Sequence, residues 1–300
     1  MYFVGNSIKL RAMGCQESQP SHYSTNRLMK ASTSCLESLA ITVVIFLTIF
    51  FYIYGIYIVL PTMMGSFGQT FHGFLGAWIV FNILGNLWAC NRTKNWVASL
   101  SATELTPRKG EEYSWSRCEP CNLLMPPRSW HCKICNRCVL KRDHHCNFTG
   151  CCIGHNNHRY FIWFLFYITF GTGLALVYNL IYTVNYGQLT LIDPIVLYVL
   201  VVEMLVGLGK EEIHLKYFIF VIFYVNVVSF VFAAVKFGYQ MWLVRNNTMF
   251  CSKSKESYDM GFRENFHEVL GLRGFWTIIS PTINSPLAHN GTQWKCKQSV

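Results

Sequence analysis

Residues 118–152 read CEPCNLLMPPRSWHCKICNRCVLKRDHHCNFTGCC and contain eight of the chain's thirteen cysteines. Cysteine recurs in Cys-x2-Cys pairs, and histidine stands beside cysteine at His131-Cys132 and in Asp143-His144-His145-Cys146. In a secreted chain this density would suggest disulfides, whereas in a reducing compartment it favours metal ligands or a reactive thiol. The compartment in which this stretch lies therefore has to be established first.

The composition of the whole chain is that of a polytopic membrane protein. Of its 300 residues, 52% are hydrophobic and only 13% are charged, which is too apolar for a soluble domain of this length. A membrane-spanning helix requires about 20 apolar residues, and four stretches provide them: 39–60, 72–90, 160–184 and 217–244. A fifth run, 193–209, is shorter and carries Glu203, so we interpret it as a re-entrant or interfacial segment.

Lysine and arginine are concentrated in three segments of the chain. Four precede the first span, eleven lie between residues 92 and 159, and seven follow from Arg245 onward. Four spans place all three basic segments on the cytosolic side, as the positive-inside rule requires, whereas five would send the basic tail across the membrane. With a formal net charge of +10, attraction to anionic lipids is favoured over nucleic-acid binding, because the charge flanks the spans.

These patterns predict an all-α polytopic membrane protein with a loop-rich cytosolic domain between helices 2 and 3. The segment between the second and third spans has four prolines and little helical or strand periodicity, so we expect bound metal to order it. The predicted division of the chain is a cytosolic leader (1–38), two spans (39–90), the cysteine-rich domain (91–159), two further spans (160–244) and a cytosolic tail (245–300).

The cysteines and histidines are sufficient for two structural zinc sites. Cys-x2-Cys pairs present two thiolates to one tetrahedral ion, and imidazole completes such sites. Two sets of four ligands are available from Cys118, Cys121, Cys132, Cys135, Cys138 and Cys152 together with His131 and His145.

This assignment leaves Cys146 and Cys151 outside the metal ligands. Cys146 follows Asp143 and His144 closely, and these are the residue types that thiolate chemistry needs. An imidazole can accept the thiol proton, and a carboxylate can orient the imidazole. We therefore predict that Cys146 is a nucleophile.

The spacing of these residues resembles the cysteine-rich domain of the DHHC protein S-acyltransferases, or palmitoyltransferases. The matching pattern is Cys-x2-Cys-x9-His-Cys-x2-Cys-x2-Cys-x4-Asp-His-His-Cys-x5-Cys-x4-Asn-x3-Phe, ending at Asn157 and Phe161. The resemblance implies four spans, both termini in the cytosol and a location in the endoplasmic reticulum or Golgi. It also implies two zinc sites: Cys118, Cys121, His131 and Cys138 in one, and Cys132, Cys135, His145 and Cys152 in the other.

The resemblance further implies a ping-pong acyl transfer. Cys146 would accept a palmitoyl group from acyl-coenzyme A, with His144 as general base and Asp143 orienting it, and would pass it to cysteines of membrane-associated proteins. Arg128 and Lys141 would bind the coenzyme A phosphates, although Met125 stands where the family usually has a cation. Independently of the resemblance, we hypothesise that Gly171 in the third span leaves room for acyl chains longer than palmitate.

Two expectations concern residues outside the motif. His155 and His158 are expected to pack at the protein surface or the membrane interface, and the tail around Asn265 looks like the family's asparagine-centred C-terminal motif.

The alternative to an enzyme is a catalytically silent membrane adaptor that keeps the zinc-stabilised domain to bind a partner.

Overall fold

The computed structural model describes residues 27–186, 202, 211–250 and 257–296. Within that part of the chain, four helices are long and apolar enough to cross a membrane: Ser32–Met63, Ser66–Arg92, His158–Asn185 and Phe218–Arg245. The predicted fold class, with four candidate spanning helices, is therefore confirmed. The apolar run 193–209 lies outside the described residues except for Val202.

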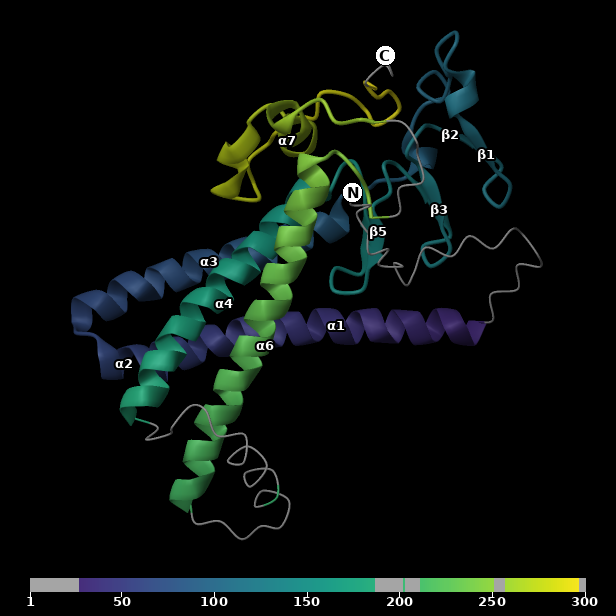
Figure 1. Cartoon of the computed structure of the whole chain (residues 1–300). Helices are drawn as coiled ribbons and strands as arrows, with labels where there is room; N and C mark the ends of the chain where they lie inside the picture. Colours follow the sequence, from purple (N-terminus) through teal and green to yellow (C-terminus); the bar gives the residue numbers. More distant parts are fainter. Residues whose placement is uncertain (1–26, 187–201, 203–210, 251–256, 297–300) are drawn as a thin grey trace, which may run out of the picture.

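The long helices are α1 (Arg27–Tyr54), α3 (Ser66–Arg92), α4 (His158–Tyr186) and α6 (Glu211–Arg245). Helix α4 packs against both α3 and α6, and α1 packs against α3 (Figure 1). The first span is interrupted by a π-helical turn (Gly55–Val59) before the short helix α2 (Leu60–Met63). Pro61 explains the interruption, because a proline inside a helix lacks the N–H donor and its ring displaces a preceding carbonyl.

Three short antiparallel hairpins form the segment between α3 and α4. They are β1 (Ser116–Cys118) with β2 (Leu123–Met125), β3 (Trp130–Cys132) with β4 (Arg137–Val139), and β5 (His144–Cys146) with β6 (Cys151–Ile153). Two 3-10 turns, Val97–Ser99 and Glu112–Ser114, precede them. The domain expected to be loop-rich is therefore also strand-containing, and strands of three residues are too short to show a period-2 pattern.

Each hairpin turns through a residue with a positive φ angle. The residues that end the three connections are Asn122 (φ 51°), Asn136 (φ 51°) and Gly150 (φ 62°). Asparagine and glycine adopt this left-handed conformation more readily than other residues. The residue at the end of each connection therefore favours the turn that brings the second strand back beside the first.

The tail after α6 folds back beside the cysteine-rich domain. Its helix α7 (Phe262–Leu270) contacts α6 and α4, and the 3-10 turn Gly274–Ile278 packs on α7 (Figure 1). Asn265 is buried, and its Nδ2 donates to the carbonyl of Arg245 at 2.6 Å and to Asp259 Oδ1 at 2.7 Å. This side chain thus ties the tail to the end of the last span.

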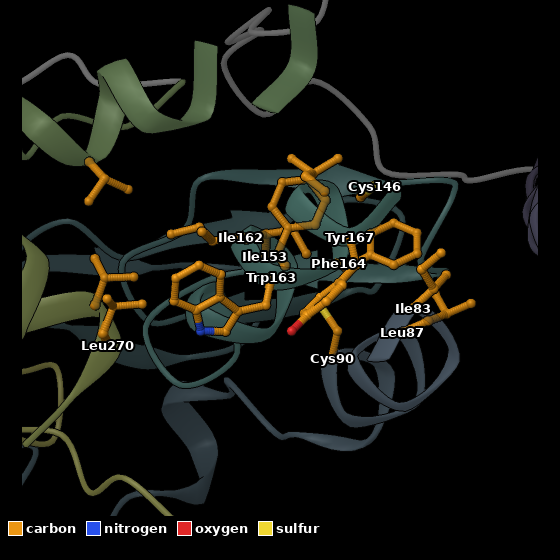
Figure 2. Close-up of a cluster of buried hydrophobic side chains, with 14 of the residues drawn as sticks. Ile83, Leu87, Cys90, Cys146, Ile153, Ile162, Trp163, Phe164, Tyr167 and Leu270 are labelled. Carbon is orange, nitrogen blue, oxygen red and sulfur yellow. The ribbon is translucent and has the colours of Figure 1, made fainter. Parts of the chain in front are cut away.

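The hairpins are attached to the spanning helices by a common core. Figure 2 shows Cys146 in the same buried cluster as Phe164 and Tyr167 of α4 and Ile83 and Leu87 of α3. The third hairpin therefore rests directly on the helices, which holds Cys146 at the junction between the domain and the membrane-spanning part.

Asn157 stabilises the junction between the hairpins and the spanning helices with hydrogen bonds. Its Nδ2 donates to the carbonyls of Cys90 (2.9 Å) and Cys152 (3.0 Å), and its Oδ1 accepts from the N–H of Gly154 (2.9 Å). These three bonds connect the end of α3, strand β6 and the start of α4. Because Asn157 is completely buried, no water can replace them.

Candidate active site and metal centres

The candidate metal ligands recur along the hairpins. Each ligand in the first set has a counterpart of the same type fourteen residues later: Cys118 and Cys132, Cys121 and Cys135, His131 and His145, and Cys138 and Cys152. In each set the histidine faces its cysteine across a hairpin, as His131 with Cys138 and His145 with Cys152. The repeat therefore builds two similar ligand sets from three similar hairpins.

The two sets are brought together in space with the same membership that the resemblance implies. In each set the four ligand atoms lie within 4.8 Å of one another. His131 Nδ1 lies 3.6, 3.3 and 3.9 Å from the sulfurs of Cys118, Cys121 and Cys138. His145 Nδ1 lies 3.7, 3.3 and 3.6 Å from those of Cys132, Cys135 and Cys152.

These distances suit zinc. In a tetrahedral site with Zn–S near 2.3 Å and Zn–N near 2.0 Å, sulfur and nitrogen ligands lie about 3.5 Å apart. The middle hairpin contributes to both sets, because adjacent residues of a strand point to opposite faces and His131 and Cys132 thus diverge. A zinc ion in each set would tie two consecutive hairpins together.

By the fourteen-residue repeat, Cys146 corresponds to the first cysteine of a Cys-x2-Cys pair, but within the part of the chain that the structure describes no further set of candidate ligands surrounds it. It lies fourteen residues after Cys132, and Thr149 stands where the second cysteine of a pair would be. Among the described residues, Cys146 belongs to neither metal-binding group. Burial raises the pKa of its thiol, but hydrogen bonds from His144 and Thr149 outweigh burial and hold that pKa below its ordinary range.

His144 connects Cys146 to a buried carboxylate. Its Nδ1 donates to Asp143 Oδ2 at 2.8 Å, and its ring also contacts Cys146. Burial disfavours the protonated ring, but Asp143 and Cys146 more than compensate and raise the pKa of His144 to about 9. The imidazole of His144 thus contacts the carboxylate of Asp143 on one side and the thiol of Cys146 on the other.

Asp143 is held by two further donors that the sequence did not indicate. Its Oδ1 accepts from the N–H of Phe250 at 2.7 Å, and its Oδ2 accepts from Gln240 Nε2 at 2.8 Å. Gln240 lies in the last span and Phe250 just after it. Polar residues within membrane spans often belong to functional sites. The position of Gln240 in the last apolar stretch could therefore have drawn attention to it.

A cavity of about 500 Å³ adjoins these residues. His144, Cys146 and Phe148 line it together with apolar residues of all four spanning helices, including Leu47 of α1, Ile79 of α3, Gly171 of α4 and Phe232 of α6. The lining further from Cys146 includes His72 and Tyr178, which hydrogen-bond each other. The lining is mainly apolar, and Cys146 forms part of it.

Arg128 and Lys141 lie together, but they are buried. They are 6% and 3% exposed, and both face Glu268, with Lys141 Nζ 2.9 Å and Arg128 Nη1 3.6 Å from its Oε1. Trp294 of the tail covers them, since its ring centre is 4.5 Å from the Arg128 guanidinium carbon and 5.3 Å from Lys141 Nζ. In this conformation neither cation is open to a ligand in solution.

We expected His155 and His158 to pack at the protein surface or the membrane interface, and the first of these two locations is wrong. Both rings are buried. His158 Nε2 lies 3.1 Å from Gln240 Nε2, beside the carboxylate of Asp143, and His155 Nε2 donates to the carbonyl of His289 at 2.8 Å. The last span and the tail cover these positions, and neither is near them in sequence.

Comparison with known proteins is consistent with this geometry. A family model described as DHHC palmitoyltransferase matches residues 111–258, which include all three hairpins, α4 and α6. No curated protein matches the chain.

Proposed function

Because this chain belongs to the DHHC palmitoyltransferase family, we propose that it is a protein S-acyltransferase that carries a long-chain acyl group on Cys146. The donor is an acyl-coenzyme A such as palmitoyl-coenzyme A, and the acceptor is a cysteine of a membrane-associated protein. The observation that carries this proposal is the contact series of Asp143, His144 and Cys146 beside an apolar cavity.

In the first half-reaction, the Cys146 thiolate attacks the thioester carbonyl of the acyl-coenzyme A. The bond between the acyl carbon and the coenzyme A sulfur breaks, and coenzyme A leaves as a thiolate that takes up a proton. His144 accepts the proton of Cys146 before the attack and can return it to the leaving sulfur, while Asp143 holds its ring. The hydrogen bonds that lower the pKa of the Cys146 thiol support this role.

In the second half-reaction, a cysteine thiolate of the acceptor protein attacks the acyl-Cys146 thioester. A new thioester forms on the acceptor, and the Cys146 thiolate is released. The apolar cavity supports a long acyl chain as the group transferred, because burial of each methylene contributes about 0.8 kcal/mol. Cys146 lies where the hairpins meet the spans, which suits acceptor cysteines close to a membrane surface.

Two zinc ions and coenzyme A complete the proposed site. The two Cys3His sets would bind structural zinc and hold the hairpins in register. Arg128 and Lys141 would bind phosphates of coenzyme A. Because both are buried under Trp294, this role requires the tail segment 285–296 to move away.

The orientation and location are also proposals. The distribution of lysine and arginine supports a cytosolic catalytic domain and cytosolic termini, within the division 1–38, 39–90, 91–159, 160–244 and 245–300. The family makes the endoplasmic reticulum or the Golgi the proposed compartment.

The enzyme and the adaptor hypotheses predict different results with purified protein. We would incubate the full-length protein with labelled palmitoyl-coenzyme A and compare the wild type with Cys146→Ser, measuring bound zinc in both. The enzyme predicts a hydroxylamine-sensitive label on Cys146 in the wild type and none in the variant, with about two zinc ions retained in each. A zinc-loaded wild type that takes no label would favour the adaptor.

A further inference from the structure

The two candidate zinc sites differ at the far nitrogen of the histidine. In the second site, His145 turns Nδ1 toward three sulfurs, while its Nε2 lies 2.9 Å from Glu37 Oε1. The His145 side chain is 5% exposed and that of Glu37 is 17% exposed. The imidazole therefore bridges the ligand set and a carboxylate that water reaches only partly.

In the first site, the corresponding nitrogen has no such partner. His131 Nε2 is buried and makes no hydrogen bond within the part of the chain that the structure describes. Its Nδ1 faces three sulfurs at distances like those around His145. The sites thus have the same donor atoms, and they differ in what supports the histidine.

Glu37 comes from outside the cysteine-rich domain and is held in place by the packing of α1. Ile41 and Val44 follow Glu37 at helical spacings of four and seven residues, so the three share one face of α1. Ile41 and Val44 pack against the core that contains Cys146. Gly150, in the turn after β5, lies so close to Ile41 that an added Cβ would be 2.8 Å from its Cδ1.

We propose that Glu37 is a positioning residue for the second zinc site. Its carboxylate accepts the Nε2–H of His145, which fixes the tautomer that leaves Nδ1 free to bind the metal and strengthens that nitrogen as a ligand. Because His145 lies between His144 and Cys146, the first spanning helix thereby helps to hold the proposed nucleophile. The inference rests on the zinc sites of the proposed function.

A carboxylate in this position has a measurable consequence. Loss of such a partner typically lowers metal affinity by about 10- to 100-fold. In the wild type, we therefore expect the second site to lose zinc more slowly than the first. Replacing Glu37 should accelerate zinc loss from the second site alone.

The test follows the two sites separately in the full-length protein in lipid nanodiscs. Excess chelator is added with an alkylating reagent, and mass spectrometry measures modification of Cys121 and Cys135 over time. These cysteines hold equivalent positions in the two sets, and both are half-buried. We expect Cys135 to react more slowly than Cys121 in the wild type, and about tenfold faster in Glu37→Gln than in the wild type.

Two further variants make the result specific. Glu37→Asp keeps the charge and should recover part of the protection of Cys135, whereas Glu119→Gln removes an exposed carboxylate beside the first site and should change neither cysteine. Equal acceleration at Cys121 and Cys135 in Glu37→Gln, or unchanged protection of Cys135, would overturn the proposal. A wild type that contains no zinc at all would instead overturn the metal sites of the proposed function.

Discussion

Gln240 and His144 donate hydrogen bonds to the same oxygen of Asp143. Gln240 Nε2 and His144 Nδ1 each lie 2.8 Å from Asp143 Oδ2. Gln240 is 3% exposed and belongs to the last spanning helix. The carboxylate that accepts a hydrogen bond from His144 is therefore also held by a residue of the last candidate span.

Removing the Gln240 amide should slow acylation of Cys146. A hydrogen bond to a charged group contributes about 1.5 to 3 kcal/mol, so Gln240→Ala should reduce the rate by about tenfold or more. Single-turnover formation of the acyl-enzyme from labelled palmitoyl-coenzyme A measures this rate. Gln240→Glu should be slower still, because it sets a second carboxylate against Asp143.

A glutamine at the far end of α3 provides the control for this prediction. Gln69 Nε2 donates to the carbonyl of Met64 at 2.8 Å, at the opposite end of α3 from the hairpins. Gln69→Ala should acylate at the wild-type rate. If Gln240→Ala also did so while keeping its zinc, Gln240 would have no part in orienting Asp143.

Spacing in the sequence was enough to predict the spans and the candidate ligands. The four apolar stretches and the eight candidate ligand residues are local features, and the part of the chain that the structure describes contains four candidate spans and two groups made of those residues. The hairpins were missed because three-residue strands show no periodicity, although Asn122 and Asn136 carried a turn signal.

Contacts between distant segments were not predictable in the same way. Glu37 meets His145, Gln240 meets Asp143, and Trp294 covers Arg128 only because helices and tail pack together. No spacing rule reports that packing. For this reason Arg128 and Lys141 were expected to face a ligand, whereas the structure buries them under the tail.

Loss of the Asn157 side chain should destabilise the protein. Asn157→Ala leaves the buried Gly154 N–H without its side-chain acceptor, and it leaves the carbonyls of Cys90 and Cys152 with only the longer contacts from Cys151 Sγ (3.5 Å) and Asn95 Nδ2 (3.5 Å). Unsatisfied buried groups cost about 1 to 3 kcal/mol each, so we expect a fall in melting temperature of several degrees. Asn156→Ala, at a more exposed neighbour, should have a smaller effect. An equal fall in both variants would contradict the special role of Asn157.

Filling the cavity at Gly171 should shift the preferred acyl chain to shorter lengths. Gly171 lines the cavity, and an added Cβ would lie 2.9 Å from Ile79 Cγ2. Gly171→Tyr should therefore favour myristoyl- over stearoyl-coenzyme A when the two compete with palmitoyl-coenzyme A for Cys146. Gly173 lies on the same helix but faces Phe230. Gly173→Ala should therefore keep the wild-type preference for acyl-chain length. An unchanged preference in Gly171→Tyr would show that the chain does not pass this point.

Removing Trp294 should make Arg128 and Lys141 available to coenzyme A. The two cations share one carboxylate, Glu268, and the indole of Trp294 lies over both. Each cation–π contact contributes about 0.5 to 2 kcal/mol, which a phosphate must replace when it binds. We therefore expect Trp294→Ala to lower the KM for palmitoyl-coenzyme A several-fold, measured from the concentration dependence of acyl-enzyme formation.

A second tryptophan of the tail provides the matched control. Trp276 is 71% exposed, so Trp276→Ala removes an indole without uncovering the cations and should leave the KM unchanged. Combining Trp294→Ala with Arg128→Gln should abolish the gain, since the uncovered guanidinium is then absent. If Trp294→Ala left the KM unchanged and lowered only the melting temperature, Arg128, Lys141 and Glu268 would form a structural ion cluster, and coenzyme A would bind elsewhere.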